Sequence, residues 1–245
     1  MRVAANRIRN IVLCVCLGIA PLLATAQTSE RSDADPLERF NRKIFAFNET
    51  LDKYLLRPVA QGYRTVTPDV VDRGITNIFN NLDDVLVTAN SLLQLKGHKA
   101  AVSLSRFLFN TTFGVAGFFD VATGFGLEKQ EEDFGQTLGY WGVGSGPFLM
   151  LPVLGPSTVR DGAARVPEVY VDPTYYWLSG REAVMVAMVK GIDRRADLIP
   201  GEGLVVGDRY SFIRNVYLQR REYLVQDGQV DDPFASDEFD EDFEF

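Results

Sequence analysis

The chain has 245 residues, enough for one domain with a hydrophobic core or at most two small ones. Hydrophobic residues make up 46% and charged residues 24% of it, which excludes a wholly disordered chain, a collagen and a coiled coil. Its net charge of −8 argues against a nucleic-acid partner, because phosphate binding needs a basic surface. The single histidine, His98, argues against a multi-histidine metal site and against a histidine base.

The first 26 residues have the pattern of a signal peptide. Three arginines precede an apolar stretch from Ile11 to Ile19, and Ala24 and Ala26 stand where a signal peptidase reads small residues. We therefore expect cleavage after Ala26 and export. A retained transmembrane anchor is the alternative, but Pro21 interrupts the stretch, and a spanning helix needs about 20 apolar residues.

Both cysteines, Cys14 and Cys16, lie in this signal, so we expect a mature chain without a disulfide or a thiolate metal site. The residues that precede them, Leu13 and Val15, are too large for a lipoprotein cleavage site. No lipid-attachment cysteine is therefore evident.

Acidic residues are concentrated at the C-terminal end. Nine acids lie in residues 227–245, a segment without Lys or Arg. Such a run repels itself and predicts a disordered acidic tail, although its four phenylalanines leave a short docking motif as an alternative. Residues 27–34 are polar and predict a flexible lead-in, which leaves 35–226 as one folded domain.

Apolar residues at helical spacing predict helices along most of this domain. The first helix begins after Pro36, and we expect it to stop at Arg57–Pro58, because a residue before proline avoids helical angles. Thr67-Pro68-Asp69 is typical of a helix start. A helix or broken helix pair should run from there to Leu95, with Gly97 as its C-terminal signal.

Three further helices are predicted. The first is marked by Leu104, Phe107, Leu108 and Thr111. The second begins with a capping box at Ser179 and Glu182 and ends at Pro200-Gly201, with one apolar face made of Met185, Met188, Val189, Ile192 and Ala196. Asp208 caps the last helix, in which Tyr210, Ile213, Tyr217 and Leu224 recur. We find no run of alternating strand residues, so the predicted fold class is all-α.

One segment, residues 134–159, is free of charge over its whole length. Its glycines and prolines argue against a continuous helix and predict a turn-rich segment with Phe148-Leu149-Met150-Leu151 as its apolar centre. Residues 107–119 are also uncharged, rich in phenylalanine and broken by glycine. Two apolar segments that are each too broken to span suggest embedding from one side of a bilayer. A buried loop in a soluble protein is the alternative.

Enzymatic motifs are weak in this chain. The glycine-rich residues 142–146 lack the Gly-Lys-Ser/Thr of a phosphate loop and the Gly-x-Ser-x-Gly of a nucleophile elbow. His98 lies between lysines at a helix end, and clustered acids such as 131–133 are more typical of solvated faces. We predict no catalytic residue, no metal and no cofactor.

Several motifs in a fixed order resemble the VacJ/MlaA family. The resemblance runs from about residue 35 to 226 and is specific because the motifs occur together. They are DPLERFNR at 35–42, FAFN at 45–48, RF at 106–107 with NTT at 110–112, GFFDVA at 117–122, FGQTLG at 134–139, WGVG at 141–144, GPF at 146–148, LP at 151–152 and STVRD at 157–161.

The resemblance implies a protein of the Gram-negative outer membrane that maintains lipid asymmetry. It implies a ring-like arrangement of amphipathic helices in the periplasmic leaflet, often beside trimeric porins, with a central passage for phospholipids that are mislocalised in the outer leaflet. It further implies a periplasmic MlaC-like carrier that delivers them to an inner-membrane ATP-driven transporter. Many members of the family are lipoproteins, and this sequence departs from them by lacking the cysteine.

Motif position and chemistry together suggest residues for such a passage. We expect Asn110, Thr111, Thr112 and Gln136 to offer hydrogen bonds to headgroups, and a glycine-rich loop to form a wall that can move. The wall would comprise Gly135, Gly142, Gly144 and Gly146, with Pro147 and Phe148 at its exit. An exported lipid hydrolase and a structural membrane scaffold are the alternative functions.

Overall fold

The computed structural model describes residues 35–174, 178–204 and 207–229. The predicted signal peptide, the lead-in 27–34 and residues 230–245 of the predicted tail lie outside the described residues. All the elements considered below belong to one unit, Pro36–Phe245.

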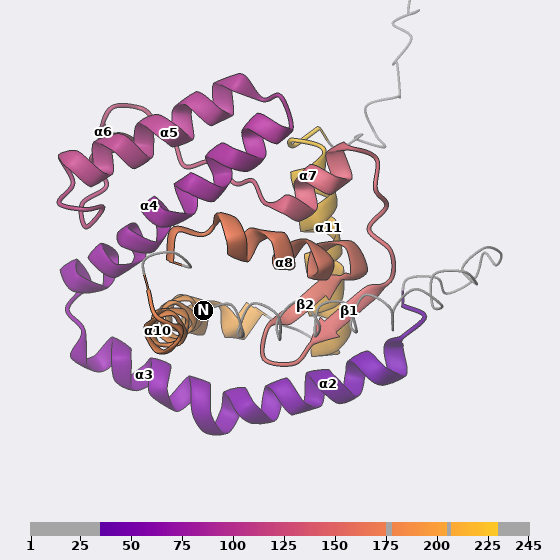
Figure 1. The fold of residues 1–245 in the computed structure, drawn as a ribbon. Coiled ribbons are helices and arrows are strands. Elements are labelled where there is room, and N and C mark those ends of the chain that lie inside the picture. The colour runs from indigo at the N-terminus through magenta and orange to yellow at the C-terminus, as the bar shows by residue number, and fades with distance from the viewer. Residues whose placement is uncertain (1–34, 175–177, 205–206, 230–245) are drawn as a thin grey trace, which may run out of the picture. The chain divides into compact units, whose positions relative to one another are not determined.

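Helices dominate this unit and follow one another around a central region that α8 crosses (Figure 1). The predicted all-α class is therefore confirmed. The elements in chain order are α2 (Glu38–Leu51), η2 (Asp52–Leu56), α3 (Arg57–Val66), α4 (Asp69–Leu93), α5 (Gly97–Thr112), α6 (Val121–Gly124), α7 (Phe134–Tyr140), β1 (Phe148–Leu151), β2 (Gly155–Thr158), α8 (Val159–Val171), α10 (Gly180–Leu198), η3 (Ile199–Leu204) and α11 (Arg209–Val225).

The prediction that the first helix stops at Arg57–Pro58 was wrong, because the chain stays helical through these residues. A π-helical turn, η2, joins α2 to α3, and the backbone N–H of Arg57 bonds to the carbonyl of Asp52. Pro58 then stands in the first turn of α3, where its missing N–H costs nothing. The wide π turn makes room for a proline ring that would clash inside a regular α-helix.

Helix α4 ends before Leu95, and Gly97 is the first residue of α5 rather than a stop signal. The left-handed position after α4 is occupied by Leu95, with φ of +59°. The N–H of Leu95 bonds to Leu92 and that of Lys96 bonds to Ser91, which together form a Schellman motif. Leu95 therefore takes a conformation that usually belongs to glycine. It is also 87% exposed.

The expectation that strands are absent was wrong for the apolar centre of the uncharged segment. β1 and β2 form an antiparallel hairpin in which Phe148 is opposite Thr158. Two asparagines of α2 hold β1 through its backbone. Asn41 donates to the Phe148 carbonyl at 3.0 Å and accepts from the Met150 N–H at 2.9 Å, and Asn48 does the same for Leu151 and Val153. These side chains supply the partners that a further strand would have given.

A small aromatic core lies behind this hairpin. Phe148, Met150 and Tyr210 are buried there, with Ile44, Phe45, Tyr217 and Leu218 packed around them. The core thus joins the hairpin to α2 and α11. The predicted start of α11 is confirmed, with Asp208 at the N-cap position, but the carboxylate of Asp208 pairs with Arg42 at 2.7 Å instead of capping the helix.

The pair α4 and α5 is polar inside and apolar outside. Asn81, Asp84, Gln94, Ser103 and Asn110 are buried, whereas several leucines and phenylalanines of the same region are exposed. The exposed set includes Leu92, Leu93, Leu104, Leu108, Phe113, Phe119 and Phe125. The predicted apolar face of α10 behaves similarly, since Met185, Met188 and Val189 are exposed and only Ala196 is buried.

Arg106 is the centre of the polar interior of this pair. Its side chain is 2% exposed and ion-pairs with Asp120 at 2.9 Å and with Asp84 at 3.4 Å. It also donates to the Thr123 hydroxyl at 2.9 Å and to the Leu127 carbonyl. A guanidinium that is removed from water needs such partners, because an unpaired buried charge is very costly.

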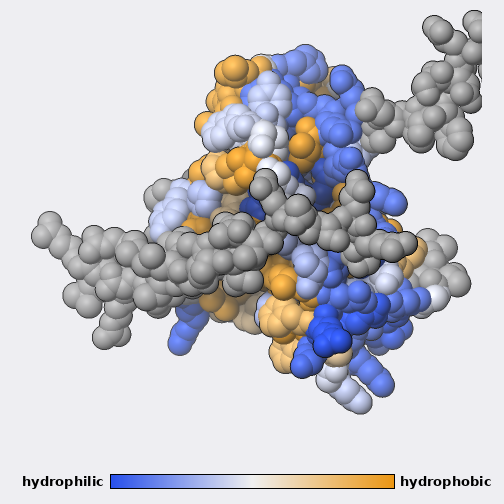
Figure 2. All heavy atoms as spheres, turned by 90° about the vertical axis from the view of Figure 1, so that its right-hand side faces the viewer, coloured by the Kyte–Doolittle hydropathy of each residue, from blue (hydrophilic) through white to orange (hydrophobic). Residues whose placement is uncertain are grey.

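No described helix is both long and apolar enough to cross a membrane. On the face shown in Figure 2, apolar patches border strongly polar ones.

We predict that Leu95→Gly stabilises the fold by about 1 kcal/mol, because glycine adopts the left-handed conformation without the steric cost of a Cβ. The exposed leucine gives up little packing in exchange. The midpoint of chemical unfolding in detergent checks this. The control is Leu92→Gly, within the last turn of α4, which should destabilise the protein by a similar amount. A lower midpoint for Leu95→Gly would show that Leu95 makes contacts that outweigh its backbone strain.

Candidate functional site

A cavity of about 730 Å³ lies among the helices of the unit. Its lining comes from α4, α7, α8, α10, α11 and the segment 129–133. Acidic and basic side chains occur in equal number in this lining. The acids are Asp83, Glu131, Glu132, Asp133, Asp161 and Glu168, and the bases are Lys129, Arg165, Lys190, Arg194, Arg220 and Arg221. Leu86, Val87 and Leu224 contribute apolar side chains to the same lining.

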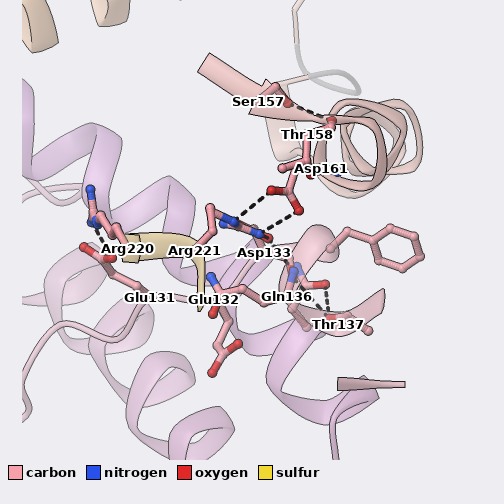
Figure 3. A network of polar contacts seen from close by, with 12 residues as sticks. Glu131, Glu132, Asp133, Gln136, Thr137, Ser157, Thr158, Asp161, Arg220 and Arg221 are labelled. Atoms are coloured by element: carbon pink, nitrogen blue, oxygen red, sulfur yellow. Dashed lines mark hydrogen bonds and ion pairs between the residues drawn. The ribbon is translucent and has the colours of Figure 1, made fainter. Parts of the chain in front are cut away.

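Arg221 of α11 joins the starts of two helices on one side of the cavity (Figure 3). Its guanidinium contacts Asp133, with Nη2 2.9 Å from Oδ1, and Asp161, with Nε 3.0 Å from Oδ2. Asp133 caps α7 by accepting from the N–H of Gln136 at 2.7 Å. Asp161 lies in the first turn of α8, whose N-cap is Thr158. One cation therefore fixes the relative position of α7, α8 and α11.

The charges of this group are strongly coupled. Burial alone would raise the pKa of Asp133, but the hydrogen bonds and the charge of Arg221 hold that pKa below its ordinary value. The hydroxyl of Tyr217 donates to Asp161 at 2.8 Å, and burial together with that neighbouring carboxylate raises the pKa of Tyr217. At neutral pH the tyrosine is therefore a donor and the carboxylate of Asp133 is ionised.

Glu132 connects the cavity to the turn between α4 and α5. Its carboxylate is fully buried and contacts Lys96 at 3.1 Å, Lys99 at 2.7 Å and the amide of Gln94 at 2.8 Å. The same two lysines bind Asp227, at 2.6 and 2.7 Å. Asp227, the first residue of the predicted tail, is therefore held by the folded unit.

Arg165 differs from the other cations of the lining. Lys190 and Arg194 contact Asp83, Lys129 contacts Asp84, and Arg220 contacts Glu131. Within the described part of the chain, Arg165 makes no ion pair and no hydrogen bond. One turn further along α8, Glu168 accepts from the N–H of Phe134 at 2.6 Å, and burial raises its pKa.

Two of the residues predicted for a passage line this cavity, Gly135 and Gln136. Gly135 must lack a side chain, because a Cβ there would lie 2.5 Å from Asp161 Oδ1 and 2.8 Å from Arg221 Nη2. Glycine thus lets the backbone of α7 approach the ion pair closely. Gln136 lies beside it and is buried.

The predicted polar residues of α5 lie elsewhere. Asn110 is buried, donates to Asp120 at 3.1 Å and accepts from the N–H of Ala122 at 2.9 Å, which ties α5 to α6. Thr111 accepts from Asn81 at 2.8 Å, and the hydroxyl of Thr112 donates to the carbonyl of Leu108 within its own helix. None of the three is among the residues that line the cavity.

The glycine-rich loop also lies apart from the cavity lining. Gly142, Gly144 and Gly146 are exposed, and the loop is fastened to the start of α8 by the bond from Val159 N–H to the Pro147 carbonyl at 3.1 Å. Phe148 points into the aromatic core. A role of this loop as a passage wall stays a prediction.

Sequence reasoning missed the charged residues that dominate the cavity. The sequence predicts a solvated face for the acids 131–133, and it gives no sign of Arg221 because the partners of Arg221 are 88 and 60 residues away in the chain. No local spacing could have indicated them. The one available signal is the position of Asp133 next to the uncharged segment 134–159. A carboxylate that is buried beside such a segment needs a cation as its partner.

Comparisons with known proteins give consistent matches. A family model described as MlaA lipoprotein matches residues 33–224. The intermembrane phospholipid transport system lipoprotein MlaA of Escherichia coli K12 is 35% identical over 213 residues, 84% of each chain. An uncharacterized protein of Rickettsia felis is 39% identical over 196 residues, 78% of each chain. A solved structure that concerns the structural basis for maintenance of bacterial outer membrane lipid asymmetry matches with a TM-score of 0.72 and 36% identity, over 80% of this chain and 100% of that one.

We predict that Asp133→Asn lowers the free energy of unfolding at pH 7 by about 3 kcal/mol, because it leaves Arg221 with one carboxylate and weakens the cap of α7. A carboxyl with a depressed folded pKa stabilises above its unfolded pKa, near 3.9, and loses this contribution as the pH falls through the folded pKa. The difference between variant and wild type should therefore shrink below about pH 4.

Urea unfolding at several pH values measures this difference. The control is Glu128→Gln, which removes an exposed acid that has no ion pair among the described residues and should change little at any pH. A gap between wild type and Asp133→Asn that stays constant down to pH 3 would contradict the coupling to Arg221.

Proposed function

The chain belongs to the MlaA lipoprotein family, and on that basis we propose that it is the outer-membrane component of an intermembrane phospholipid transport system. In this role it removes phospholipids that are mislocalised in the outer leaflet and so maintains lipid asymmetry. The names of its relatives and the subject of the matching structure support this role.

The observation that carries the proposal is the combination of an apolar outer surface with a charged cavity. Exposed leucines and phenylalanines on α4, α5 and the segment that follows suit a hydrocarbon environment, where burial of apolar surface is favourable. A phospholipid headgroup has the opposite requirement, because its charges need polar partners wherever water is absent. The cavity offers such partners inside the ring of helices.

We propose that Arg165 meets the phosphate of the headgroup. Every phospholipid carries a phosphate group, and a guanidinium binds it through two parallel hydrogen bonds. The other cations of the lining are already paired with carboxylates, so their charge is largely compensated. Arg165 therefore offers the most available positive charge to an entering headgroup.

Transport without catalysis is the simplest version of this function. His98, the single histidine, is exposed at the start of α5 and does not line the cavity. We propose that the protein works beside a porin and passes lipid to a periplasmic MlaC-like carrier, as expected from the resemblance to the family. We further propose that a signal peptide ending at Ala26 is removed, that apolar surface rather than a lipidated cysteine attaches the protein to the periplasmic leaflet, and that the loop 142–146 moves during passage.

Deletion of the gene should raise the amount of phospholipid exposed on the cell surface. Complementation of the deletion strain with single variants then tests the role of individual residues. Arg165→Gln should restore asymmetry poorly and Arg165→Lys should restore most of it, because lysine keeps the charge. The control, Arg181→Gln, removes an exposed cation at the start of α10 that does not line the cavity and should complement fully.

Surface phospholipid has to be compared at equal amounts of each variant in the outer membrane. Full complementation by Arg165→Gln would remove this residue from the path. Unchanged surface phospholipid in the deletion strain would contradict the proposed function itself.

A further inference from the structure

Helix α2 and the turn η2 carry three exposed cations that no acid of the described residues contacts. Arg39, Lys43 and Lys53, which we call the basic stripe, make no ion pair within residues 35–174, 178–204 and 207–229. The acids of the same elements are all paired. Glu38 contacts Arg42 at 2.7 Å, Glu49 contacts Arg209 at 2.8 Å and Asp52 contacts Arg195 at 2.6 Å.

The basic stripe borders an apolar row. Phe40, Phe47 and Tyr54 recur every seven residues and are 50%, 51% and 73% exposed. Lys43 lies three residues after Phe40 and four before Phe47, so the three side chains share one helix surface. Lys53 lies over the ring of Tyr54 at 5.3 Å. Cations and aromatic rings therefore occupy neighbouring strips of the same surface.

The opposite side of α2 packs against the rest of the protein. Asn41 and Asn48 hold the β1 backbone, and Ile44 and Phe45 pack on the aromatic core. The helix is thus fixed in orientation, and the basic stripe and the apolar row cannot turn inward. In Figure 1, α2 and α3 lie along one side of the unit.

We propose that this surface binds anionic phospholipid headgroups of the leaflet in which the protein sits. An interfacial helix buries its apolar side at the boundary of headgroups and acyl chains, and cations beside that side then lie at headgroup depth. Every phospholipid has a phosphate, but in a zwitterionic lipid the positive group of the headgroup offsets the phosphate charge. Cations without a paired acid therefore favour a lipid with net negative charge. The proposal rests on the proposed function, because it assumes contact with a membrane.

An acidic protein is the competing occupant, but the apolar row argues for lipid. Tyr54 and Leu55 project from the turn, and the exposed Val59 and Val66 continue the apolar surface along α3. This gives a long, narrow strip along a curved helix, which suits a fluid surface better than a compact protein partner.

The experiment mixes the full mature chain, in detergent, with vesicles of phosphatidylcholine alone or with added phosphatidylglycerol, dilutes the detergent and measures the fraction of protein that floats with lipid. Wild type should float with both and more with the anionic vesicles. Arg39→Gln/Lys43→Gln should lower partition onto anionic vesicles by roughly thirtyfold at low salt, because each of the two cations near such a surface contributes about 1 kcal/mol. It should bind neutral vesicles as wild type does.

The matched control is Arg181→Gln/Arg214→Gln, which changes net charge equally on α10 and α11 and should keep the preference for anionic vesicles. Circular dichroism confirms that both double variants fold. An undiminished preference in Arg39→Gln/Lys43→Gln, or an equal loss in the control, would overturn the assignment of this surface. Failure of wild type to float with either vesicle would instead overturn the membrane contact that the proposed function requires.

Discussion

The burial of Arg106 between Asp84 and Asp120 is the interaction on which the rest of the structure depends. A guanidinium at 2% exposure holds α4, α5 and the α6 region together through charge and hydrogen bonds. Because the interior of this helix pair is polar, its apolar side chains face outward. In water this arrangement exposes much apolar surface, so apolar surroundings stabilise the pair. The inverted pattern therefore links the energetics of the fold to its membrane environment.

Buried ion pairs also organise the cavity. Arg221 fixes α7, α8 and α11 around a space with equal numbers of acidic and basic side chains. Most of these charges neutralise one another, which keeps the lining polar without a large net field. Such a wall suits the proposed passage of a headgroup that carries both signs of charge, and Leu86 and Leu224 add apolar surface to it.

Most helices could be predicted from the sequence, since spacing and caps are local signals. The capping box at Ser179 and Glu182 and the start of α11 at Asp208 are examples. The errors arose where tertiary context overrides local preference. Pro58 is accommodated by a π turn, Leu95 takes a glycine conformation, and the 148–158 hairpin is stabilised by Asn41 and Asn48 from a distant helix. Of the predicted site, Gly135 and Gln136 reach the cavity, whereas its charged lining depends on long-range pairs that no spacing reveals.

Helix spacing also predicted which residues of α5 and α10 share a face, but not that this face points outward. The direction of the apolar face can be measured with single cysteine variants, since both natural cysteines lie in the predicted signal peptide. Nitroxide labels at Leu104→Cys and Leu108→Cys, with Glu128→Cys as the polar reference, are placed in lipid bilayers and exposed to oxygen and to a water-soluble nickel complex. An inverted helix pair predicts that the labels on α5 collide with oxygen and are shielded from nickel, while the reference shows the reverse. Labels on α5 that nickel reaches as readily as the reference would contradict a lipid-facing apolar surface.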